Sequence, residues 1–214
     1  GSNVWVMIVK SVDFIKKTSN YMVQTVTLYS AQPQAIAENI RQGNTHYAKL
    51  DSIREKYGEE VAPVFTQAYN WFVRQAEQIV SKPPEAESAI WVYHDLHLLE
   101  QHSGYEIMTL DIPLTEVIFF KMSDWNKVLN QRFLAINDQE NVDFANKLEK
   151  QGINYEGDLF RKPFYPQLKQ EVIKNWQNLF RFHQVIQDAL HQDNELPIKD
   201  IQAAVWKLPK DWIK

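Results

Sequence analysis

The chain has 214 residues and a formal net charge of −4, and 44% of its residues are hydrophobic and 23% charged. This composition is typical of a folded globular protein and excludes the disordered, collagenous and disulfide-dense classes. Because the sequence contains no cysteine, it also excludes thiolate zinc sites and cysteine nucleophiles, and it indicates a cytoplasmic protein.

The first quarter of the chain predicts a short extension followed by a strand and a helix. We expect residues 1–21 to be an N-terminal extension or leader, and residues 22–214 to form a single domain. Residues 25–30 are rich in β-branched and aromatic side chains, which favours a strand. Pro33 suits the first turn of the helix that follows, and Gly43 is placed to close it.

The middle of the chain predicts helices and then three strands. Residues 51–81 have helical character with a break between 58 and 63, and from Val64 onward the apolar residues recur at amphipathic helical spacing. Pro83 stops this helix. Short apolar or alternating runs then predict strands at residues 89–93, 105–112 and 117–120.

The last part of the chain is mostly helical. Ser123 is a suitable N-cap for one helix, and further helices are expected over 142–150 and 167–190, before a final strand at 198–208. Strands interrupted by helices of unequal length predict an α+β fold, with a small mixed β-sheet and several packed helices. The first and last strands enclose all other elements, so we expect them to lie side by side and to line a ligand-binding cleft.

Several short phrases, taken in order along the chain, resemble one bacterial family. The phrases are Leu28-Tyr29-Ser30-Ala31-Gln32, Ala68-Tyr69-Asn70-Trp71-Phe72, Ile90-Trp91-Val92-Tyr93, Trp125 with Val128-Leu129-Asn130, and Gln202-Ala203-Ala204-Val205-Trp206. They resemble the domain of unknown function 3841 over residues 23–208. Phe120-Lys121 departs from the Ser-Asp pair that is usual in the family. Since the function of that family is unsettled, the resemblance implies a fold and no mechanism.

The end of the first strand suggests a site for an anionic ligand. It leads directly into a helix N-terminus, where backbone N–H groups are unpaired. The order of strand, helix and glycine is similar to the opening of the ADP-ribosyltransferase-like fold. That similarity implies NAD as a cofactor and a transfer reaction in which a preorganised site stabilises an oxocarbenium-like ribose.

The same similarity implies roles for individual residues. Gln32 and Tyr29 would orient the nucleotide, and Ser30 stands where a histidine or arginine is typical. An aromatic ring would stack on the nucleotide, and a polar residue of the last strand would contact the ribose. The candidates are Gln32, Asp200 and Gln202 for catalysis, and Tyr29, Ser30, Tyr47 and Trp91 for cofactor binding. As an alternative, Tyr29 and Trp91 are core aromatic residues, Gln32 caps the helix, and Gln202 is exposed to solvent.

The sequence gives less support to a metal site, a nucleic-acid partner or a membrane-spanning helix. His94, His97 and His102 lie close together with Asp95 and Glu100, but on a strand the H-x-x-H spacing places the two rings on opposite faces. We therefore expect a polar loop and no metal site. No lysine- or arginine-rich run predicts a nucleic-acid partner, and no apolar run reaches the ~18 residues of a membrane helix.

Two functions of different class remain open from the sequence. One is an ADP-ribosyltransferase-like, nucleotide-binding protein. The other is a non-catalytic interaction domain of a bacterial stress, phage or mobile-element system. The expected partner is accordingly a small molecule or another protein.

Overall fold

A five-stranded sheet lies at the centre of the computed structural model, which describes residues 24–59 and 62–214. The strand order is β3-β1-β2-β5-β4, and the four pairings that join these strands are antiparallel. The expected α+β class is confirmed. The sequence predicts a mixed sheet, but the four pairings found are all antiparallel. The strands are β1 (Thr25–Pro33), β2 (Ile90–Tyr93), β3 (Tyr105–Pro113), β4 (Ile118–Lys121) and β5 (Ile201–Val205).

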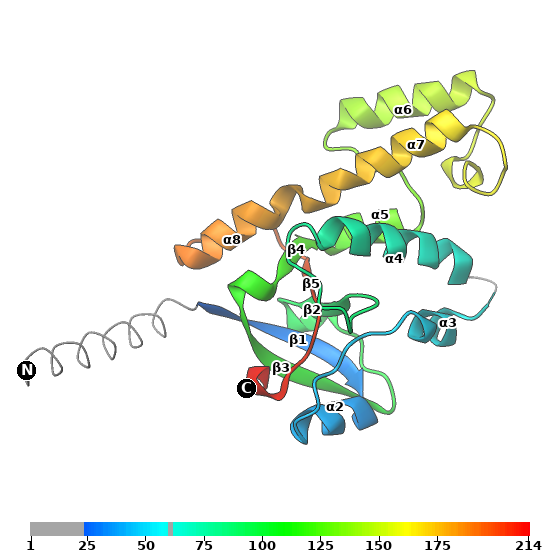
Figure 1. The fold of residues 1–214 in the computed structure, drawn as a ribbon. Coiled ribbons are helices and arrows are strands. Elements are labelled where there is room, and N and C mark those ends of the chain that lie inside the picture. Colours follow the sequence, from blue (N-terminus) through cyan, green and yellow to red (C-terminus); the bar gives the residue numbers. More distant parts are fainter. Residues whose placement is uncertain (1–23, 60–61) are drawn as a thin grey trace, which may run out of the picture.

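Each face of the sheet packs against helices (Figure 1). The α2 face is the side that packs against α2 (Gln34–Arg41) and α8 (His183–His191), and the α4 face is the side that packs against α4 (Ala62–Ala76) and α5 (Met122–Leu129). Successive residues of a strand point to opposite faces. β2, β4 and β5 therefore contribute alternate side chains to two different cores, whereas the buried hydrophobic residues of β1 and β3 belong to the core of the α2 face.

The predicted break in the second helical region is confirmed. α3 (Asp51–Tyr57) ends at Gly58, which has φ +79°, and α4 begins at Ala62. Glycine adopts this left-handed conformation without the steric cost that a Cβ atom imposes. The break lets α4 run along the sheet, while the end of α3 is held beside it by the ring contact of Tyr57 with Phe65, at 4.5 Å between centroids.

A helical arm made of α6 (Asp138–Lys150) and α7 (Pro166–Asn175) lies beyond α4 and α5 (Figure 1). The predicted continuous helix over 167–190 is corrected here, because a 3₁₀ segment, η4 (Trp176–Phe182), separates α7 from α8. Residues i and i+3 of a 3₁₀ helix are aligned. The segment therefore turns Trp176 and Leu179, both fully buried, toward the same core.

The predicted cleft between the first and last strands is wrong, because β2 lies between β1 and β5. Ile90 and Val92 of β2 are at most 3% exposed. A strand this deeply buried satisfies its backbone N–H and C=O groups by pairing on both edges. The short apolar run at 90–93 thus occupies the position that the cleft would need.

Two further expectations concern helix starts and membrane insertion. Pro33 is the last residue of β1 and the N-cap of α2 rather than a helical residue.

None of the helices in the described ranges is both long and apolar enough to cross a bilayer. The division of the chain at residue 21 lies outside the described residues and stays a prediction.

A partly buried histidine links α8 to the edge strand β4. The Nδ1 atom of His183 accepts a hydrogen bond of 3.0 Å from the backbone N–H of Phe119, and burial lowers the pKa of His183 below its ordinary value of 6.5. Below pH 6.5 the unfolded chain therefore binds more protons at this site than the folded protein. The free energy of unfolding consequently falls as the pH drops from 6.5 toward the folded-state pKa.

We expect the melting temperature to decrease between about pH 7.5 and about pH 5.5, where histidines titrate. Burial also lowers the pKa of His46, which adds to the same trend. The variant His183→Asn retains an acceptor for Phe119 and removes the titrating group, so its decrease should be shallower. Circular dichroism melts across this range test the expectation, and equal pH slopes for the variant and the wild type would contradict it.

Candidate functional site

Three side chains lie opposite one another across three neighbouring strands. Tyr29 of β1 pairs with Tyr93 of β2, and Tyr93 pairs with Gln202 of β5. Directly opposed residues point to the same face of a sheet, and Phe120, the other partner of Gln202, belongs to the core under α4. Tyr29, Tyr93 and Gln202, here named the cross-strand row, therefore lie on the α4 face.

The amide of Gln202 is the most unusual group of the cross-strand row. The residue is 2% exposed, but its amide atoms are not among the fully buried polar atoms that lack a partner in the described ranges, where Asp124 Oδ2 is the atom found. Since buried polar groups are normally satisfied by protein, water or ligand, the Gln202 amide, which forms no hydrogen bond within the described residues, reaches the molecular surface, where water satisfies it.

Two tyrosine hydroxyls meet beside the row. The hydroxyls of Tyr57 and Tyr69 are 3.3 Å apart, and the rings of Tyr69 and Trp91 have centroids 5.5 Å apart. Burial, with smaller contributions from Tyr57 and Glu100, raises the pKa of Tyr93 to about 12. Burial also raises the pKa of Tyr69. Tyr69 and Tyr93 therefore stay protonated at neutral pH and serve as hydrogen-bond donors.

Ser30 and Gln32 lie on the other side of the sheet from Tyr29. The hydroxyl of Ser30 donates to the backbone carbonyl of Trp91 at 3.2 Å, and the amide of Gln32 donates to the Ser30 hydroxyl at 2.9 Å. Ser30 pairs with Met108, which belongs to the core of the α2 face. The alternation of β1 thus separates Gln32 and Ser30 from the cross-strand row.

Asp200 caps a helix. Its carboxylate Oδ2 accepts a hydrogen bond of 3.1 Å from the backbone N–H of Ser123, and its carbonyl accepts one of 2.9 Å from the N–H of Met122. These N–H groups belong to the first turn of α5, where backbone N–H groups have no acceptor within the helix. The predicted N-cap at Ser123 is corrected accordingly: α5 begins at Met122, and Asp200 supplies the cap from a distant part of the chain.

The two remaining candidates are aromatic residues that pack against the core. Trp91 and Tyr47 are both half-buried and contact the core of the α4 face. The ring of Trp91 lies 5.0 Å from Trp125 and 5.1 Å from Phe72, measured between centroids. Trp91 therefore packs beside Tyr69. The segment around Tyr47 pairs with the residues that precede β2 through an isolated bridge between Ala48 and Ser88.

The histidine-rich stretch follows β2 as a loop. Asp95 accepts a hydrogen bond of 2.9 Å from the N–H of His97 and so caps a short 3₁₀ turn, Leu96–Leu98. The Nε2 atom of His102 lies 3.4 Å from the Glu100 carboxylate. Within the part of the chain that the structure describes, no group of three or more histidine, aspartate or glutamate side chains is arranged to hold a metal ion.

The sequence reasoning identified two members of the cross-strand row and missed the third. Tyr93 is the residue that joins Tyr29 to Gln202, and it alternates with Val92 along β2. The alternation of residues 90–93 could have placed Tyr93 on the same face as Trp91. Helical spacing alone indicates Tyr69 as a core aromatic residue, and the structure adds that its hydroxyl meets that of Tyr57.

The cross-strand row offers phenol hydroxyls and one primary amide to a ligand. These groups bind and orient a polar, planar molecule, because each presents a hydrogen-bonding group next to an aromatic surface. They provide no carboxylate nucleophile. The chemistry of the site therefore favours binding and positioning over attack on a substrate by a residue of the row.

Comparisons with known proteins agree with the resemblance of the sequence phrases. The model of the family described as "Domain of unknown function (DUF3841)" matches residues 27–214. The curated proteins give no match, and neither do the solved structures. Tyr29, Tyr93 and Gln202 all fall within the matched range. The chain belongs to the DUF3841 family.

Proposed function

We propose that the cross-strand row binds a nicotinamide-type nucleotide, so that the protein is an ADP-ribosyltransferase-like, nucleotide-binding protein of the bacterial cytoplasm. The observation that supports this proposal is the position of Gln202, a residue 2% exposed that lies directly opposite Tyr93 in the cross-strand row. A carboxamide such as that of nicotinamide is complementary to the side-chain amide of Gln202, since two primary amides can donate to and accept from each other.

Aromatic rings next to the amide support the same ligand class. Tyr29 and Tyr93 lie in one row with Gln202, and tyrosine rings provide flat surfaces on which a pyridinium ring can stack. The Tyr93 hydroxyl, with its pKa near 12, stays a donor toward ribose oxygens. These features favour a nucleotide over a purely apolar molecule.

The absence of charge on Gln202 limits the reaction that this site supports. An oxocarbenium-like ribose is stabilised by a negative charge placed where the positive charge develops. A neutral amide provides only its dipole. We therefore propose binding of the nucleotide with slow transfer, rather than fast turnover.

The second candidate function is a non-catalytic interaction domain. It is favoured by apolar side chains on and next to the helical arm, where large exposed apolar surface is typical of interaction sites. The side chains, each more than half exposed, are Ile136, Val142, Tyr155 and Phe164. A nucleotide-binding test of the cross-strand row distinguishes the two candidates.

Isothermal titration of the full chain with NAD tests the proposal. We expect saturable binding, weakened at least ~10-fold by Gln202→Leu, which is the loss of about 1.4 kcal/mol of binding free energy. Tyr93→Phe should weaken binding several-fold, because it removes the hydroxyl and keeps the ring. The matched control is Tyr155→Phe on the arm, which should leave binding unchanged.

Circular dichroism melts of the same variants show that each is folded before binding is compared. Absence of any heat with NAD in a folded wild-type protein would overturn the proposal and favour the interaction domain. Equal affinities for the wild type, Gln202→Leu and Tyr93→Phe would place the nucleotide elsewhere on the molecule and would also contradict it.

A further inference from the structure

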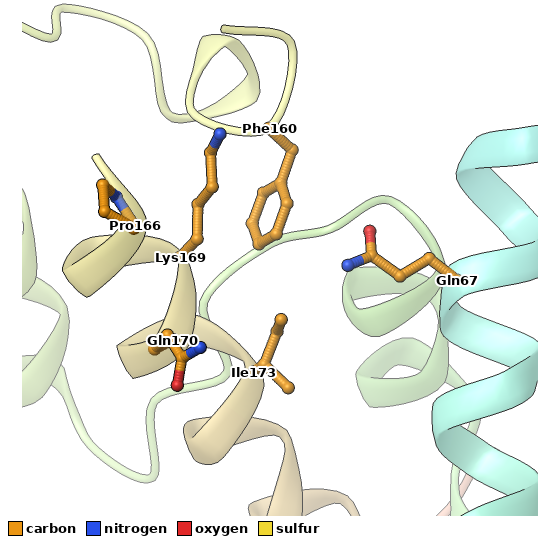
Figure 2. Close-up of a pocket in the computed structure, with 6 residues that line it drawn as sticks. All are labelled: Gln67, Phe160, Pro166, Lys169, Gln170 and Ile173. Atoms are coloured by element: carbon orange, nitrogen blue, oxygen red, sulfur yellow. The ribbon is translucent and has the colours of Figure 1, made fainter. Parts of the chain in front are cut away.

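A hollow of about 340 Å³ lies between α4 and the helical arm, apart from the cross-strand row (Figure 2). α4 contributes one wall, and α7 with the loop before it contributes the other. This volume is near the lower end of the ~300–1,000 Å³ that is typical of small-molecule sites. The residues that line the hollow are Gln67, Phe160, Pro166, Lys169, Gln170 and Ile173.

The walls of the hollow combine apolar surface with a directed amide. Phe160, Pro166 and Ile173 present ring and aliphatic groups, and Figure 2 shows the Gln67 side chain extending from α4 toward them. The Oε1 atom of Gln67 accepts a hydrogen bond from the side chain of Gln131. The amide nitrogen of Gln67 therefore keeps its two N–H donors for a molecule in the hollow.

The charge at the hollow is positive and is not neutralised locally. Lys169 is the charged residue of the lining. Its ammonium group donates to the backbone carbonyl of Lys162, and it forms no ion pair with a carboxylate among residues 24–59 and 62–214. An ammonium group has three donors, so two remain for an anion. The lining contains no aspartate or glutamate that would repel one.

We propose that this hollow binds a small carboxylic acid with an apolar body of about one ring. The carboxylate lies between the Lys169 ammonium and the Gln67 amide, and the apolar body lies against Phe160 and Ile173. A neutral ligand would leave the Lys169 charge without a counterion, and a ligand without an apolar body would leave the Phe160 ring and Ile173 in water. Only a molecule with both a carboxylate and an apolar body neutralises the Lys169 charge and also covers the apolar side chains.

The experiment compares phenylacetate with phenylacetamide, which have the same ring and differ in charge. The Phe160 ring stacks on Trp176 at 6.2 Å between centroids, so a ligand against Phe160 should change tryptophan emission. We expect saturable binding of phenylacetate by fluorescence and by isothermal titration. Binding of phenylacetamide should be at least ~10-fold weaker, since a charge-assisted hydrogen bond is roughly twice as strong as a neutral one.

Two variants and one control place the ligand in the hollow. Lys169→Gln keeps a donor for the Lys162 carbonyl and removes the charge, and it should weaken phenylacetate binding at least ~10-fold. Ile173→Trp fills the hollow and should abolish binding. Lys174→Gln changes an exposed lysine of the same helix and should leave binding unchanged.

Three outcomes would overturn the proposal: no saturable binding of phenylacetate, equal affinity for the acid and the amide, or binding that survives both Lys169→Gln and Ile173→Trp. Thermal melts identify any variant that fails to fold. If Ile173→Trp does not fold, Lys169→Gln alone decides the outcome. NAD titration of the same variants distinguishes this site from the cross-strand row, because Lys169→Gln and Ile173→Trp should leave NAD binding at the row unchanged.

Discussion

Replacement of Trp176 by alanine is expected to lower the free energy of unfolding by about 3–5 kcal/mol, as is usual when a buried aromatic side chain is truncated. Trp176 is fully buried and joins the helical arm to the sheet-bearing body. Its ring centroid lies 5.4 Å from that of Trp71 in α4, and its indole N–H donates to the carbonyl of Arg132 at 2.8 Å. Alanine removes both contacts and leaves a cavity.

The variant Trp176→Phe separates packing from hydrogen bonding. It keeps most of the ring and loses the indole N–H, so it should cost less than Trp176→Ala, including about 1–3 kcal/mol for a buried carbonyl left without its donor. Urea unfolding followed by circular dichroism measures both values. A loss below about 1 kcal/mol for Trp176→Ala would show that the arm does not depend on this residue.

Replacement of Arg181 by methionine is expected to destabilise the protein by about 2–4 kcal/mol at neutral pH, because it leaves a buried carboxylate without its counterion. The Asp124 side chain is 6% exposed, and the Nη1 atom of Arg181 lies 3.0 Å from its Oδ2 atom. No aligned hydrogen-bond donor to this oxygen is found within the described residues. Since the Arg181 side chain is itself 28% exposed, the expected loss is below that of a fully buried pair.

The pH dependence of this variant has a definite sign. Burial raises the pKa of Asp124 above its ordinary value, and Arg181 opposes that rise. Without Arg181 the folded-state pKa rises further, so the folded protein takes up a proton at a higher pH than the unfolded chain. The deficit of Arg181→Met should therefore shrink as the pH falls toward 3.8, the ordinary value for the carboxyl.

Unfolding in urea at about pH 7.5 and at about pH 5 tests this expectation. The double variant Asp124→Asn with Arg181→Met removes both charges and should recover part of the stability lost in Arg181→Met alone. A deficit that is independent of pH and is not relieved in the double variant would show that the charge of Asp124 does not cause it.

Local patterns determined the elements of this protein. The alternation at 105–112 and the β-branched run at 25–30 predicted two strands of the sheet, and both are present as β3 and β1. Gly58 and Pro63 marked the break between α3 and α4. Such features depend on backbone conformations that each residue adopts with its near neighbours, and they also carried the family resemblance.

Only the tertiary structure decided how these elements meet. The insertion of β2 between β1 and β5 removed the predicted cleft and brought Tyr93 between Tyr29 and Gln202. Asp200 became a helix cap because the first turn of α5 needed an acceptor that lies far away in the sequence. The order of the strands, the strand with which each one pairs, and the face to which each side chain points depend on hydrogen bonds and packing between residues that are distant in the chain. The local spacing of residues in a single sequence does not determine these contacts.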